Sequence, residues 1–220
     1  MIKLSHLFAR SFSHGIHPPE NKHFTAHKPI TRLPFAPELV LPLSQHAGKP
    51  SVPLVRAGQE VVRGEPIARA DGFVSVPLHA PATGRIRDIR LMPSARGPRV
   101  ECLILEVYPG DPQEILYGAP LDVDALSPKD ILKAVQDTGL VGLGGAAFPT
   151  HVKMSVPEGC TIDTILINGC ECEPFLTTDH RLMVEQAADL VKGTRILMRA
   201  LGAARAVIGT EDNKMDAVEA

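Results

Sequence analysis

The residues best suited to chemistry begin with a loop of small side chains. Glycines occupy positions 142, 144 and 145, and a lysine follows at position 153. Glycine lets the backbone come close to a ligand and turn its N–H groups toward an anion. A nearby ammonium group adds a full positive charge. We therefore predict that Gly142, Gly144, Gly145 and Lys153 hold the phosphate of a cofactor.

A second group of polar residues follows an apolar run. The run Thr164–Ile167 leads directly into Asn168, and Glu171 stands three residues further on. Open α/β folds place ligand groups at the carboxyl ends of their strands. The polar side chains after this run, Asn168 and Glu171 among them, are therefore placed where a cofactor can bind. Each of the two groups has an alternative interpretation without a ligand. Most glycine loops are only turns, and the acidic residues after the strand can form a solvated turn.

A helix is predicted immediately before the glycine loop. Ser127 suits the N-cap, Pro128 the first helical position, and Gly139 the C-terminal stop. After the loop, an apolar run at 165–167, an amphipathic helix at 182–201 and an apolar run at 207–208 predict a β-α-β unit with buried strands. Residues 214–220 resemble the start of another helix, so we expect the chain to end within a domain.

The first half of the chain has a different character. Short alternating runs between glycines and prolines at 54–107 predict a small β sandwich or barrel. The expected domains are an extended arm at 1–53, a β-rich domain at 54–124 and the first part of an α/β domain at 125–220. Residues 14–53 of this arm hold five histidines, which we interpret as loop and surface residues, with a metal cluster as the alternative: His14, His17, His23, His27 and His46.

Composition narrows the classes of function. A net charge of −2, 4% aromatic residues and no tryptophan argue against a nucleic-acid surface. No apolar run is long enough to span a bilayer, and the N-terminus lacks a signal-peptide pattern. We expect a cytoplasmic protein whose membrane association comes through a partner. The four cysteines show no CxxC spacing, so no metal site and no disulfide scaffold are predicted.

The β-rich segment resembles a known architecture. Its pattern G-x-x-V-x-x-G-x-x-I-A at 58–68 and the V-x-x-P-x-x-A-P-x-x-G-x-I pattern that follows it are similar to the barrel-sandwich hybrid of biotinyl and lipoyl carrier domains. Those carriers attach their prosthetic group to a lysine at a hairpin tip. The corresponding turn at 69–72 has no lysine, so the resemblance implies an architectural module.

Nearly the whole chain resembles the C subunit of Rnf (Rsx) electron-transport complexes, a relative of the flavoprotein subunit of respiratory complex I. The matching motifs run in the family's order: HGIHPPENK at 14–22, PLxQHxGxP at 42–50, GFVSVPLHAPATG at 72–84, GLGGAAFPTHVK at 142–153, INGCECEP at 167–174 and IGTEDNK at 208–214.

The resemblance implies specific cofactors. FMN would be held by Gly142, Gly144, Gly145 and Lys153, with NADH stacking on the flavin. Asn168 and Glu171 match residues beside the flavin and nicotinamide in the complex I relative. The chain departs from that relative at Cys170, Leu143 and Ala147, where aspartate, arginine and glycine are usual. Hydride transfer is cofactor chemistry that needs no protein acid or base, so no catalytic residue is predicted.

The resemblance also implies a setting. The subunit would belong to a membrane-bound complex that couples electron transfer between NAD(H) and ferredoxin to ion translocation. It would lie peripherally on the cytoplasmic side of the inner membrane. Its [4Fe-4S] clusters would lie beyond Ala220, because the chain has no CxxCxxCxxxCP motif. We expect a fragment that is inactive alone. The alternatives are a corrin-reducing flavoprotein of similar architecture and a non-catalytic docking scaffold.

Overall fold

The computed structural model describes residues 18–95, 97–110, 113–143 and 146–220. The chain forms two compact units. The first comprises Met1–Thr31, Leu166–Val191 and Ile208–Ala220, and the second comprises Arg32–Ile165 and Lys192–Val207. The boundaries between the units fall within three elements, β10 (Thr164–Asn168), α4 (Ala187–Leu201) and β11 (Arg205–Gly209).

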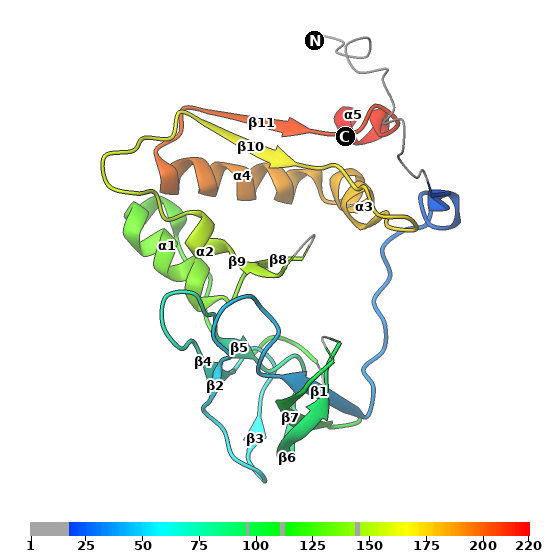
Figure 1. The fold of residues 1–220 in the computed structure, drawn as a ribbon, viewed down its shortest axis with the longest axis vertical. Coiled ribbons are helices and arrows are strands. Elements are labelled where there is room, and N and C mark those ends of the chain that lie inside the picture. The colour runs from blue at the N-terminus through cyan, green and yellow to red at the C-terminus, as the bar shows by residue number, and fades with distance from the viewer. Residues whose placement is uncertain (1–17, 96, 111–112, 144–145) are drawn as a thin grey trace. The chain divides into compact units, whose positions relative to one another are not determined.

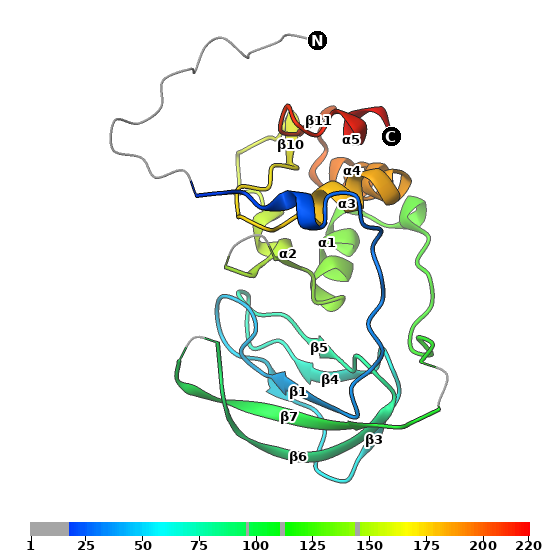
Figure 2. The same cartoon turned by 90° about the vertical axis from the view of Figure 1, so that its right-hand side faces the viewer.

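The second unit contains a curled four-stranded antiparallel sheet (Figure 2). Its strands run in the order β1-β7-β6-β3, with bounds β1 (Glu38–Pro42), β7 (Arg99–Val107), β6 (Gly84–Pro93) and β3 (Glu60–Val61). The long central strand β7 pairs with β1 on one side and β6 on the other. Residues 102–105 of β7 are completely buried, so apolar side chains fill both faces of this strand.

A second, three-stranded sheet completes the β-rich region. It has the order β2-β4-β5, with bounds β2 (Val52–Pro53), β4 (Pro66–Arg69) and β5 (Leu78–His79). Both sheets contribute to one core, which includes Leu43, Val55, Val61, Ile67, Ala68, Ala80, Ala82, Ile86, Leu103, Leu105 and Val107. The predicted β-rich region is confirmed. Strands β1 and β2 show that residues 38–42 and 52–53, expected in the arm, pair with this region.

Helix α1 (Pro128–Asp137) follows the short 3-10 helix η2 (Val123–Ala125). The Ser127 side chain accepts a hydrogen bond from the Asp130 backbone N–H, and the Asp130 carboxylate accepts from the Ser127 N–H. This capping box satisfies two N-terminal donors at once. Gly139 follows with φ +74°, a left-handed conformation that suits a helix stop. The predicted start and end of this helix are confirmed.

The first unit contains η1 (Lys22–Phe24), α3 (Thr178–Glu185) and α5 (Met215–Glu219). A single helix over 182–201 is wrong: α3 begins at residue 178, and a separate helix α4 (Ala187–Leu201) follows (Figure 1). The break falls at Gln186, whose φ of −132° and ψ of 35° are not helical. Apolar periodicity continues across this residue, which is why the sequence pattern does not reveal the break.

Strands β10 (Thr164–Asn168) and β11 (Arg205–Gly209) form a two-stranded sheet. Their arrows point the same way in Figure 1, as predicted for a β-α-β unit. The expectation that both strands are buried is wrong. Leu166 is 72% exposed and Val207 44% exposed, because two strands alone leave part of their apolar surface uncovered. The fold thus combines a barrel-sandwich hybrid with α/β elements.

Candidate functional site

The glycine loop connects two short strands. Strands β8 (Val141–Gly142) and β9 (Phe148–Pro149) pair in an antiparallel hairpin, with Gly142 opposite Phe148. Gly142 therefore lies at the point where the loop begins. Gly144 and Gly145 lie outside the described residues. Leu143, where the complex I relative has arginine, is 85% exposed.

Lys153 returns to the start of this loop. It is the last residue of the short helix α2 (Thr150–Lys153), which follows β9 directly. A Cβ atom added to Gly142 would lie only 2.5 Å from the Lys153 Nζ atom. The ammonium thus occupies space that a side chain at position 142 would fill. The structure therefore brings Gly142 and Lys153 together, and this pairing of bare backbone with a cation fits a phosphate group.

Ala147 closes the loop in a backbone conformation that glycine would adopt easily. Its φ is +52°, in the left-handed region. This conformation is costly for residues with a Cβ atom. The Ala147 carbonyl accepts a hydrogen bond of 3.1 Å from the Ala47 N–H, which helps to hold it there. Ala147 thus adopts this conformation despite its methyl group.

His151 anchors helix α2, a role that the sequence patterns did not predict. The side chain is 2% exposed, and its Nε2 atom lies 2.7 Å from the Phe73 carbonyl oxygen, to which it donates. The Phe73 ring meets the imidazole edge-on, with centroids 5.7 Å apart. Because His151 precedes Lys153 by two residues, this anchor fixes the short helix that carries the lysine. In the sequence, this role is indicated only by the position of the histidine between the glycine loop and Lys153.

Asn168 ends strand β10 in the first unit. Its Oδ1 atom accepts a 3.1 Å hydrogen bond from the Cys170 N–H, which turns the chain after the strand. The next residue, Gly169, is closely packed, because an added Cβ would lie 2.8 Å from Met183 Sδ and 3.0 Å from the Gly209 oxygen. The side chain of Asn168 is thus held at an exposed strand end, with its NH₂ group outside this bond.

Glu171, also in the first unit, is a buried carboxylate, only 4% exposed. Its Oε1 atom accepts a 2.6 Å hydrogen bond from the Asp179 N–H. Its Oε2 atom is buried and has no hydrogen-bond partner among the described residues. Buried polar atoms are almost always paired, so an unpaired acceptor fits a ligand that donates a hydrogen bond. Burial, and then the charges of Glu171 and Glu173, raise the pKa of Asp179.

The described part of the chain contains no group of three or more His, Cys, Asp or Glu side chains that could hold a metal ion. Cys102 is buried in the core, whereas Cys160, Cys170 and Cys172 are exposed thiols. His180, for which the sequence predicted no role, lies 2.9 Å from Asp216 Oδ1. Nor does any described helix have the length and apolar character needed to cross a membrane.

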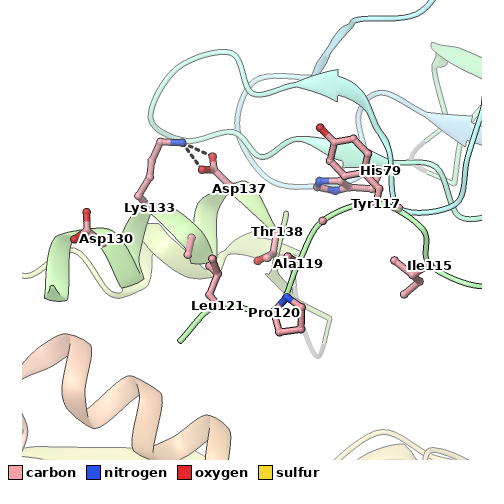
Figure 3. A pocket seen from close by; sticks show the side chains of 13 residues that line it. His79, Ile115, Tyr117, Ala119, Pro120, Leu121, Asp130, Lys133, Asp137 and Thr138 are labelled. Atoms are coloured by element: carbon pink, nitrogen blue, oxygen red, sulfur yellow. Dashed lines mark hydrogen bonds and ion pairs between the residues drawn. The ribbon is translucent and has the colours of Figure 1, made fainter. Parts of the chain in front are cut away.

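A cavity of about 680 Å³ lies in the second unit and is shown in Figure 3. Helix α1 contributes Lys133 and Asp137, which form an ion pair, and strand β5 contributes His79. Burial lowers the pKa of His79, and the charge of Asp137 opposes that shift. None of the four predicted cofactor ligands that the structure describes, Gly142, Lys153, Asn168 and Glu171, lines this cavity.

Comparison with known proteins assigns both halves of the chain. The family described as the RnfC barrel sandwich hybrid domain matches residues 10–108. The family described as the Nuo51 FMN-binding domain matches residues 135–220. The chain belongs to the RnfC family. The second match contains all six predicted ligands, Gly142, Gly144, Gly145, Lys153, Asn168 and Glu171.

Curated RnfC relatives agree with this assignment. The C subunit of the Na⁺-translocating ferredoxin:NAD⁺ oxidoreductase complex of Acetobacterium woodii is 41% identical over 213 residues, which cover 96% of this chain and 47% of the relative. The corresponding protein of the proton-translocating complex of Clostridium ljungdahlii is 38% identical, with 96% and 46% covered. The C subunit of the ion-translocating oxidoreductase complex of Edwardsiella ictaluri is 38% identical, and the match covers 95% of this chain and 26% of the relative. The chain thus spans about half or less of these relatives.

Proposed function

We propose that this chain binds FMN and forms the flavin-binding part of a C subunit in an ion-translocating, ferredoxin- and NAD(H)-linked electron-transport complex. The observation that carries the proposal is the contact of the Lys153 ammonium with Gly142, inside the segment that matches an FMN-binding domain. The ammonium and the backbone of the loop supply the charge and the donors that a phosphate group requires.

The six predicted ligands have three roles in this proposal. Gly142, Gly144, Gly145 and Lys153 bind the FMN phosphate. Asn168 offers a side-chain amide to the edge of the flavin ring. Glu171 offers the unpaired Oε2 atom as a hydrogen-bond acceptor. When bound, FMN supplies the chemistry that passes a hydride's two electrons on one at a time. The protein residues bind and orient the cofactor, and none acts as an acid or base.

The wider assignment follows from the relatives. Their names describe subunits of ion-translocating complexes that transfer electrons between ferredoxin and NAD⁺. We extend this activity to the protein that contains this chain. NADH is then the flavin's reaction partner, and [4Fe-4S] clusters beyond Ala220 receive the electrons. The other complex subunits are the partners, and the subunit lies peripherally on the cytoplasmic side of the membrane. The chain by itself is inactive in electron transfer to ferredoxin.

The test is FMN retention by the purified chain and its Gly142→Ala variant. The new methyl group would meet the end of a flexible lysine side chain, so the fold should survive while the ammonium is displaced. Loss of one charge-assisted contact costs about 1.5–3 kcal/mol, which predicts an FMN affinity at least about tenfold weaker. Fluorescence titration with FMN measures this. Lys153→Ala should weaken binding to a similar extent.

The matched control is Gly159→Ala, because no atom lies within 4 Å of a Cβ placed there. Gly159 has φ +80°, so the substitution is expected to change stability, but Gly159 is none of the six proposed ligands, so unchanged FMN affinity is expected. Equal FMN affinity in wild type, Gly142→Ala and Lys153→Ala would refute the assigned phosphate site. A chain that stays colourless after FMN addition would favour the docking scaffold.

A further inference from the structure

A separate cavity of about 440 Å³ lies entirely within the first unit. It is formed by the segment around η1, by α3 and by the turn that leads into α5. Its lining residues are mostly charged or polar: Glu20, Lys22, His27, His180, Asn213 and Lys214 are prominent among them. None of the four proposed FMN ligands that the structure describes lines it, although Lys22 in its lining donates to the main-chain oxygen of Glu171.

Two lysines of this cavity are unusually buried. Lys22 is 8% exposed and Lys214 only 4% exposed. The Lys22 ammonium donates to the Glu171 main-chain oxygen, which is a neutral group. For the Lys214 ammonium, no hydrogen bond or ion pair joins it to another described residue. Buried charges are normally paired, because an isolated ammonium loses much of its hydration energy. Neither cation therefore has a carboxylate partner among the described residues.

The carboxylates around the cavity do not fill this need. Glu20, Asp212 and Asp216 are exposed, and no ion pair among the described residues joins them to either lysine. Asp216 already accepts hydrogen bonds from His180. Water and salt screen exposed charges much more strongly than buried ones. Lys22 and Lys214 are therefore the charged residues of this lining that solvent screens least.

We propose that this cavity binds an oxyanion of the phosphate class through Lys22 and Lys214. Phosphate carries up to two negative charges and several acceptor oxygens, and lysine is a frequent phosphate ligand. Asn213 and His27 can add neutral donors. The volume lies within the range of small-ligand sites, about 300–1,000 Å³, and exceeds the needs of a single phosphate. Pyrophosphate, or a phosphate carried by a nucleotide, suits this space better.

The experiment is calorimetric titration of the purified chain with pyrophosphate, comparing wild type with Lys214→Met. Methionine keeps most of the apolar stem and removes the charge. Affinity should fall at least about tenfold, since a hydrogen bond to a charged group is lost. Lys28→Met is the matched control: this lysine is exposed, belongs to the same N-terminal segment and does not line the cavity. Its affinity should equal that of wild type.

Further arms separate the sources of phosphate and the possible sites. Titration with inorganic phosphate, pyrophosphate and ADP ranks free anions against a nucleotide. Lys153→Met removes the cation of the glycine loop and should leave this binding unchanged, whereas FMN affinity should fall in Lys153→Met and not in Lys214→Met. Lys22→Met should weaken pyrophosphate binding as Lys214→Met does, and circular dichroism melts confirm that each variant is folded.

Three results would overturn the proposal. The first is wild-type affinity in both Lys22→Met and Lys214→Met. The second is binding that disappears only in Lys153→Met, which would assign it to the glycine loop. The third is the absence of binding of any of the three anions to wild type at millimolar concentration. None of these results bears on FMN retention, so failure here is distinguishable from failure of the proposed flavin site.

Discussion

The β-rich core and the two-stranded sheet differ in how far their apolar side chains are buried. Leu103, Ile104 and Leu105 of β7 are completely buried between neighbouring strands. In β10 and β11, Leu166 and Val207 remain largely exposed. Both segments look equally apolar in the sequence. Exposure therefore depends on how many strands and covering layers surround a run of apolar residues, and the run itself does not reveal this.

The β-rich region and the proposed ligand-binding residues also differ in the kind of side chain that they bury. The β-rich region has an apolar core, whereas the proposed ligand-binding residues outside it include buried polar groups, among them Glu171 with one unpaired oxygen. Apolar burial stabilises a fold without requiring exact partners. Buried polar groups need exact partners, so an unpaired one points to a ligand.

The largest effect is expected from Leu103→Ala. The side chain is completely buried in the core that both β sheets share, so truncation removes apolar burial and leaves a cavity. The free energy of unfolding should fall by about 3 kcal/mol. Urea unfolding followed by circular dichroism measures it. A loss below about 1 kcal/mol would mean that this region is loosely packed, and the contrast between the two regions would disappear.

A smaller effect on stability is expected when acid protonates Asp216, a residue of the first unit. The hydrogen bonds from His180 hold the pKa of Asp216 below its ordinary value. A lowered carboxyl pKa contributes stability above about pH 4, and this contribution is lost as pH falls through the folded-state pKa. Asp216→Asn should therefore be less stable than wild type at pH 7, and the difference should shrink below about pH 4.

The measurement is the urea midpoint of wild type and Asp216→Asn between pH 7 and pH 3. The matched control is Asp212→Asn, because Asp212 is an exposed residue in the turn that leads into α5. Its stability should follow that of wild type at every pH. A difference between wild type and Asp216→Asn that stays constant down to pH 3 would show that the His180 hydrogen bonds do not stabilise the ionised carboxylate.

The smallest effect is expected from Leu166→Ala. Because this leucine is already 72% exposed, truncation removes little burial, and the free energy of unfolding should change by less than about 0.5 kcal/mol. The same urea experiment measures it, with Leu103→Ala as the buried counterpart. A loss as large as that of Leu103→Ala would show that another surface covers β10 in solution.

Local signals predicted the elements whose residues lie close together in sequence. The capping box at Ser127 and Asp130 fixed the start of α1, and alternating apolar runs identified the β-rich region. The approach of Lys153 to Gly142 was also expected, since only a short helix and a two-strand hairpin separate them. The break at Gln186 was not predicted, because its flanking residues keep helical periodicity.

The sequence by itself determined the family, the two kinds of architecture and the six candidate FMN ligands, because each depends on residue types at short, fixed spacings. Only the tertiary structure decided which polar groups are buried and which lack a partner. Lys22 donates to Glu171 across 149 positions of the chain, and His151 donates to Phe73 across 78. Such contacts depend on the folding of distant segments onto each other, and no local pattern records them.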